Sequence, residues 1–388
     1  MSQTLARHAA AVASHPWAVL AAAVAATATL ASGAVHLRID LDPELQLPAA
    51  DPYVAVDARI REEFGGRNFV AVALVPASGT VWRRDVLASV HGVTLALLDA
   101  PGVIRPNVAS LSSPYVRTIR DDGGVLAVDY LMREPPADDA GAAVIRDRYR
   151  AEPLLRGNVV SEDERAALVL ADFHDDVTAD EIAAAVERAV APYRSAEIEV
   201  ALAGEPIVAA VESGIVERQA VYFIGTIAAI VAVLWLAFGQ LQGVVLPATT
   251  ALLATACAMG FMGFVGIPMN PWTTAVPVVV VTIAAGHSAQ MLKRYGEEFA
   301  RLGERRAAVV ETTRSVAPVM LSAGATAGSG FAALSVLGIP TLTQFGLGVA
   351  SGIAAAVALE MTFMLALRSV WPVGRATEGV LSAWLGAA

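Results

Sequence analysis

Two ionisable residues, His287 and Glu360, lie inside long apolar runs of this sequence. Ionisable residues are costly within a membrane and usually face the interior of a helix bundle. Histidine titrates near neutral pH, and a neighbouring carboxylate stabilises its protonated form. His287 precedes Lys293 by six residues and Glu360 precedes Arg368 by eight, so both lie roughly 9–12 Å from the same ends of their helices. Such a pair could take up and release a proton inside a membrane.

Three polar residues near His287 could supply hydrogen bonds to this site: Thr282, Ser288 and Gln290. A plainer interpretation stays open. In it, His287 is a satisfied polar residue at a helix contact, and Glu360 pairs with a basic residue near the membrane surface.

The sequence indicates no metal, cofactor or enzymatic site. Cys257 is the only cysteine, so neither an intrachain disulfide nor a cysteine metal cluster is expected. We also find no nucleophile motif, phosphate-binding loop or other metal-ligand cluster, so we do not expect an enzyme.

The composition indicates a membrane protein. Hydrophobic residues make up 56% of the 388 residues and charged residues 16%, and the mean hydropathy is +0.57. Soluble domains carry about 25% charged residues. Six apolar runs reach the length of about 20 residues that a helix needs to cross a bilayer, one before and five within residues 218–367. We therefore predict transmembrane helices at 17–37, 220–238, 243–267, 271–292, 317–337 and 341–367. A cleavable signal peptide is the alternative for the first run.

Glycines at four-residue spacing in the last two runs predict close helix packing. The pairs are Gly324 with Gly328 and Gly348 with Gly352. Small residues at this spacing allow helix backbones to approach each other. For any single pair, tolerated small residues in a glycine- and alanine-rich chain are an equally good explanation.

Basic residues gather at one side of the predicted helices. Six lie in the segment 293–314, and Arg368 and Arg375 follow the last run. The positive-inside rule places both groups in the cytoplasm, together with the N-terminal residues 1–16 and the tail 368–388. Residues 294–316 have helical spacing and predict one amphipathic helix on the cytoplasmic surface.

Residues 38–217 then form a large domain that faces the periplasm or exterior. They hold 31 of the 37 acidic and 17 of the 27 basic residues, giving a net charge near −14. This acidity argues against a nucleic acid as a partner. Trp82 and Tyr115 are either ligand contacts or ordinary core and surface aromatics.

A strand–helix–strand order occurs twice in this domain. It predicts an α+β domain of two ferredoxin-like subdomains beside the six-helix membrane bundle. The predicted strands are 68–75, 103–111, 124–131, 166–173 and 198–203, and the predicted helices are 53–64, 82–98, 141–149 and 178–193.

Several stretches carry a family resemblance. They include "RIREEFGGRNFVAVAL", "LLDAPGVIRPNVASLSSP" and "ALAGEPIV" in the external domain. The exit of the fourth run, beginning "AAGHSAQMLKRYGEEFARLGERR", adds to them. In these stretches and in its order of helices, the chain resembles one half of a resistance-nodulation-division (RND) permease. The branch is that of the predicted exporters related to the mycobacterial membrane protein large (MMPL) group.

This resemblance implies proton-driven efflux of hydrophobic or lipid-like molecules across a bacterial inner membrane. In many relatives an ionisable residue of the fourth span, often Asp, carries the proton. Here Gly286 stands where that Asp would be expected, and His287 follows it. The fourth and sixth spans are close in this family, so we predict His287 as the proton carrier and Glu360 as its partner.

Permeases of this branch normally contain two such halves. We therefore expect this chain to act as a homodimer or with a second half, among membrane lipids and with a hydrophobic or amphiphilic substrate. The alternative is a non-transporting membrane subunit, similar to SecD and SecF or to a sterol-sensing module. The missing Asp favours that alternative, whereas His287 and Glu360 favour transport.

Overall fold

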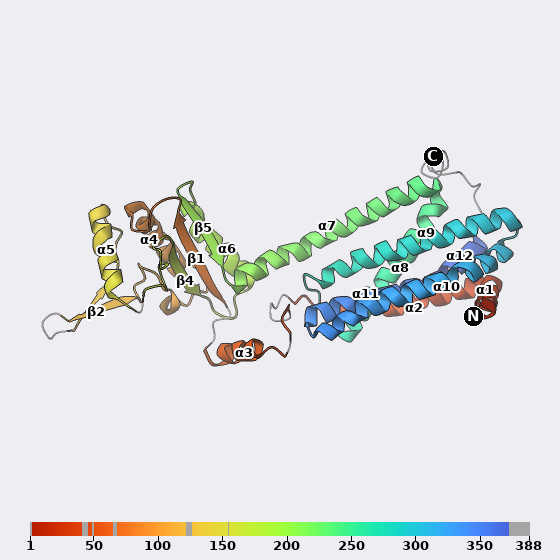
Figure 1. The fold of residues 1–388 in the computed structure, drawn as a ribbon, viewed down its shortest axis with the longest axis horizontal. Helices are drawn as coiled ribbons and strands as arrows, with labels where there is room; N and C mark the ends of the chain where they lie inside the picture. Colours follow the sequence, from red (N-terminus) through yellow and green to blue (C-terminus); the bar gives the residue numbers. More distant parts are fainter. Residues whose placement is uncertain are drawn as a thin grey trace. The chain divides into compact units, whose positions relative to one another are not determined.

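The computed structural model describes residues 2–40, 46–48, 50–64, 68–121, 126–153 and 155–371 (Figure 1). The chain divides into two compact units. The first comprises residues 1–54 and 215–388, and the second comprises residues 55–214.

The first unit is a helix bundle, and the described residues include six helices that are long and apolar enough to cross a membrane. They agree with the six predicted runs. These candidate spans are Pro16–His36, Glu205–Phe238, Leu241–Val265, Thr273–Leu302, Arg305–Leu337 and Pro340–Val370. Their elements are α2 (Pro16–Ala31) with the 3-10 turn η1 (Ser32–His36), α7 (Glu205–Phe238), α8 (Leu241–Val265), η5 (Thr273–Ala275) with α9 (Val276–Leu302), α10 (Arg305–Ala332) with η6 (Ala333–Leu337), and α11 (Pro340–Leu359) with η7 (Glu360–Met364) and α12 (Leu365–Val370).

The turn between α9 and α10 corrects one prediction. Gly303 has a φ of 71°, a left-handed conformation that glycine adopts without strain, and it ends α9. The next helix, α10, begins at Arg305. Residues 294–316 are therefore not one surface helix but the end of α9 and the start of α10. Apolar residues keep a helical spacing on both sides of Gly303, so the sequence pattern did not reveal the break.

Helix α8 packs against α2, η1, α9 and α11. Glycines allow its close approach to the first span. A Cβ on Gly260 would overlap the carbonyl oxygen of Leu30, and a Cβ on Gly263 would overlap that of Gly33. Such contacts let helix backbones touch. The four-residue spacing in the sequence indicated other glycines. Spacing within one helix does not show which helix lies opposite, so it did not identify Gly260 and Gly263.

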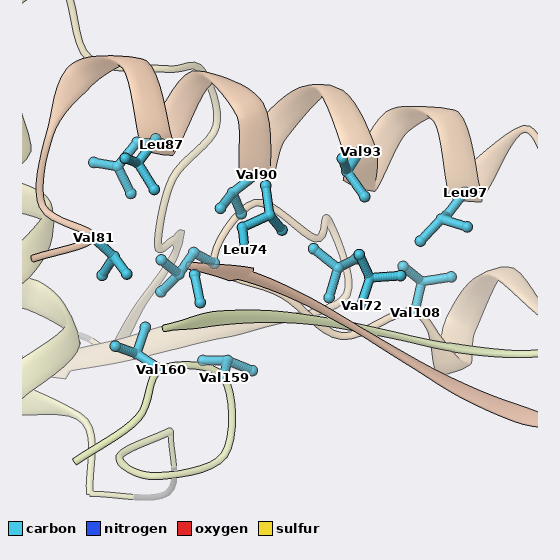
Figure 2. Close-up of a cluster of buried hydrophobic side chains, with 14 of the residues drawn as sticks. Val72, Leu74, Val81, Leu87, Val90, Val93, Leu97, Val108, Val159 and Val160 are labelled. Atoms are coloured by element: carbon cyan, nitrogen blue, oxygen red, sulfur yellow. The ribbon is translucent and has the colours of Figure 1, made fainter. Parts of the chain in front are cut away.

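The second unit is built on a three-stranded antiparallel sheet. The central strand is β1 (Phe69–Pro76), which pairs with β4 (Ala167–Asp172) on one side and β5 (Ile198–Ala203) on the other. Alternate residues of β1 are buried, as expected for a strand with one face in the core. Figure 2 shows Val72 and Leu74 of this strand facing the apolar side of α4.

The remaining elements complete this unit. A Thr178–Glu181 capping box begins α6, because Thr178 accepts a hydrogen bond from the Glu181 backbone while the Glu181 carboxylate reaches back. Strands β2 and β3 pair with each other in a separate two-stranded sheet. The elements are α3 (Pro52–Phe64), α4 (Arg84–Leu98), η3 (Arg105–Asn107), β2 (Arg117–Asp121), β3 (Leu126–Tyr130), α5 (Asp139–Ala151), α6 (Ala179–Val190) and η4 (Ala191–Tyr193).

The sheet order revises the predicted pair of ferredoxin-like subdomains. The described strands β1, β4 and β5 come from both predicted halves but share one sheet. The predicted strand 103–111 is wrong, since only Val103 and Ala109 form isolated bridges, both with the β4 region. The described residues thus contain one split βαβ arrangement, with a bridge in place of its fourth strand. Two such subdomains are not confirmed.

The two aromatic residues singled out from the sequence have different surroundings. Trp82 is 7% exposed, and its ring centroid lies 5.3 Å from that of Tyr149. It is therefore a core residue. Tyr115 is 49% exposed.

Glu164 ties three parts of the second unit together. Its carboxylate lies 2.7 Å from Arg146 and 2.7 Å from Arg150, both on α5. Its backbone carbonyl accepts a hydrogen bond from Val81, just before α4. Burial alone would raise the pKa of Glu164, but hydrogen bonds from the two arginines outweigh it and hold the pKa below its usual value. A lowered pKa in the folded state means that the ionised carboxylate stabilises the fold.

We predict that Glu164→Gln weakens the docking of α5 by on the order of 1 kcal/mol. This stabilisation should be present above the ordinary carboxyl pKa and be lost as the pH falls through the lowered value. Hydrogen–deuterium exchange of α5 in the full-length protein would measure it, with exposed Glu162→Gln as the matched control. Equal α5 exchange in wild type and Glu164→Gln at neutral pH would contradict the prediction.

Candidate functional site

His287 and Glu360 meet between two helices that pack together in the bundle. Helix α9 positions His287 and Ser288, and η7, which continues α11, positions Glu360. The Nδ1 atom of His287 lies 3.9 Å from Oε2 of Glu360. The Ser288 hydroxyl donates a hydrogen bond to Oε1 of Glu360, with 3.3 Å between the oxygens. The equal depth in the membrane predicted for His287 and Glu360 thus corresponds to a contact between them in the structure.

The two ionisable side chains differ in burial. Glu360 is fully buried, whereas the side chain of His287 is 18% exposed. Among the described residues, neither Nδ1 of His287 nor Oε2 of Glu360 has a hydrogen-bond partner. The gap between these atoms is about 1 Å longer than an ordinary hydrogen bond. A small movement of α9 against η7 would therefore close or open the contact.

The charge of this pair decides what it can do chemically. With His287 neutral and Glu360 ionised, the pair carries one negative charge. One proton, on either residue, makes the pair neutral overall. A net charge is expensive in an apolar interior, so the bundle accommodates the neutral pair better. The site can thus hold one exchangeable proton, with the partly exposed imidazole as the reachable group.

A π-helical turn carries the carboxylate. It spans Glu360–Met364, between α11 and α12, and four of its five residues are buried. Such turns are rare inside α-helices and occur frequently at functional sites. The turn changes the direction in which later side chains project. Apolar periodicity gave no sign of it.

Two of the predicted supporting residues lie away from the pair. Thr282 and Gln290 are both exposed. The Thr282 hydroxyl donates to the carbonyl of Val278 on its own helix, at 2.7 Å. Only Ser288, of the three polar residues named from the sequence, contacts Glu360.

The glycines of α11 face the helices that hold the site. A Cβ on Gly352 would overlap Val280 of α9, and one on Gly348 would lie 3.1 Å from Val276. On α10, a Cβ on Gly324 would press on Val357. Gly328 has no such neighbour within 4 Å.

Basic residues surround the end of the bundle where α9 and α12 end. Buried Glu298 pairs with Arg294 and Arg301, each at 2.6 Å. Arg368 is also buried, and its guanidinium lies 4.1 Å from the ring centre of Tyr295. It also donates to Gln242 at 2.9 Å. Arg368 is therefore part of the bundle rather than the first residue of a tail.

The alternative partner for Glu360, a basic residue near the membrane surface, is not seen. In the part of the chain that the structure describes, the only ion-pair contact of Glu360 is with His287. Arg368, the nearest candidate in sequence, has the other contacts given above.

Six apolar helices and a buried ionisable pair describe a multi-pass membrane protein with transporter-like features. The sequence model of the MMPL family matches residues 112–382. The chain belongs to the MMPL family, as its resemblance to an RND-type permease half predicted. No match was found among curated proteins.

We predict that Gly352→Ala destabilises the bundle by about 1–3 kcal/mol, because the new methyl group overpacks the contact with α9. The matched control is Gly328→Ala, where the methyl group meets no atom within 4 Å. Replacing a helical glycine by alanine in open space should be neutral or slightly stabilising. Thermal unfolding in one detergent compares the two variants. Equal midpoints would contradict the packing role of Gly352.

Proposed function

We propose that this chain is one half of a proton-driven RND-type exporter of hydrophobic or lipid-like substrates. The observation that supports it best is the His287–Glu360 pair inside the bundle. Nδ1 of His287 and Oε2 of Glu360 lie 3.9 Å apart, and neither atom has a hydrogen-bond partner among the described residues. The substrate class rests on membership of the MMPL family.

In the proposed cycle, His287 takes up a proton because its side chain is the more accessible of the pair. The imidazolium then attracts the carboxylate of Glu360, and the contact closes by about 1 Å. Proton release restores the charge of the pair and opens the contact. Since the two residues lie on α9 and η7, the closure shifts these helices against each other.

We further propose that the protein lies in a bacterial inner membrane, with residues 55–214 in the periplasm. The basic residues at the shared end of α9 and α12 support a cytoplasmic location for that end. Transport pathways in related architectures form between two repeats, so this half acts with a second copy or another half.

A non-transporting subunit, of the kind of SecD and SecF or a sterol-sensing module, is the second candidate. Gly286 favours it, because many RND relatives have an acid in the fourth span. The His287–Glu360 contact favours the exporter, since a transport-inactive subunit has no need of a buried exchangeable proton.

Proton-driven flux tests the exporter. We predict that His287→Ala and Glu360→Gln each abolish proton movement and efflux of a fluorescent lipid analogue from proteoliposomes under a pH gradient. Thr282→Ala is the matched control and should transport like wild type, because Thr282 bonds only to its own helix among the described contacts. Unchanged pH-dependent transport by His287→Ala would refute its role as the carrier.

Assembly is tested separately. We expect native mass spectrometry of the purified protein to show a dimer of the 40.2 kDa chain, or a complex with a second half when the two are expressed together. Full transport by preparations that contain only monomer would contradict the need for a second half.

A further inference from the structure

The N-terminal helix contacts the turn that carries Glu360. Helix α1 (Ser2–Ser14) places the Nε2 atom of His8 at 2.9 Å from the backbone carbonyl oxygen of Met361. A carbonyl oxygen can only accept a hydrogen bond, so this ring nitrogen carries the proton and donates. His8 and Met361 are separated by 353 residues in sequence.

The position of His8 is fixed by the apolar face of α1. Ala9, Val12 and Ala13 are buried, and Val12 and Ala13 belong to the same apolar cluster as Met361 and Met364. Their spacing is that of one helix face. This face packs α1 against α10 and α12, which brings His8 to the π turn.

The π turn contacts two different parts of the bundle. Glu360 faces Ser288 and His287 of α9, whereas the next residue, Met361, faces the cluster that contains α1. In a π turn the backbone hydrogen bonds shift from i→i−4 to i→i−5, so this segment lacks the regular ladder that holds α11 in place. An external donor to a carbonyl of this turn fixes its backbone.

We propose that His8 is a positioning residue for Glu360. Its hydrogen bond to the Met361 carbonyl holds the π turn in the conformation that points the Glu360 carboxylate at Ser288 and His287. The inference deepens the proposed function, since it gives α1 a part in the proton site. It does not require His8 to change its protonation state.

Three substitutions of His8 separate a positioning role from simple packing. Gln places an N–H donor near the Nε2 position, whereas Asn places it near Nδ1 and falls short of the carbonyl. Phe keeps a planar ring and removes the donor. His15, in the turn after α1, provides the control His15→Phe, because among the described side chains its ring forms a hydrogen bond only with Ser14.

The readout is the infrared band of the Glu360 side chain in reconstituted full-length protein, identified by its loss in Glu360→Gln. This band is the carboxylate stretch when Glu360 is ionised and the C=O stretch when Glu360 holds the proton. We expect His8→Phe and His8→Asn to shift this band and to slow proton-driven flux roughly 10–100-fold. His8→Gln should restore both, and His15→Phe should leave both unchanged.

Each outcome has a definite meaning. An unshifted Glu360 band in His8→Phe overturns the positioning role. An equal loss of proton-driven flux in His8→Phe, His8→Asn and His8→Gln overturns it as well. If wild type shows no proton-driven flux but its Glu360 band still depends on the donor at position 8, the proposed function fails and the positioning role stands. If Glu360→Gln abolishes flux while every His8 variant behaves like wild type, the positioning role fails and the proposed function stands.

Discussion

A carboxyl group with no exposed surface is the constraint on which the rest of this bundle depends. Removing an ionised carboxylate from water costs several kcal/mol even after relaxation. One hydrogen bond from the Ser288 hydroxyl, at 3.3 Å, returns only about 1.5–3 kcal/mol. The remainder must come from a proton or from an imidazolium at His287. Under the proposed function, the bundle interior links the state of Glu360 to the binding of one proton.

This link needs helices that stay close, and small residues provide the closeness. Gly348 and Gly352 let α11 approach α8 and α9, while Gly260 and Gly263 do the same for α8 and the first span. By contrast, only 6% of the apolar window of α7 and 11% of that of α10 is buried. The site thus sits in the tightly packed part of the bundle, and the loosely covered helices are free to contact lipid or another subunit.

Local patterns in the sequence predicted the features that depend on local physics. Hydropathy gave the six spans, alternation gave β1, β4 and β5, and equal depth placed His287 beside Glu360. Features set by contacts between distant segments were missed. These are the π turn, the packing of α1, the contact of Gly260 with the first span and the sharing of one sheet by both predicted halves of the second unit. Thr282 and Gln290 were named for nearness in sequence, yet a helix turns them away from the pair.

The position of the acid in this chain also changes what protonation does. Many RND relatives have the acid on the fourth span, whereas here the fourth span supplies an imidazole and the sixth supplies the carboxylate. A lone carboxyl group that binds a proton only loses its charge. A pair divided between two helices also changes the force between those helices, because an imidazolium and a carboxylate attract each other. In the proposed cycle, one group is reachable and the other is fully buried, so uptake of the proton and movement of the helices are parts of the same event.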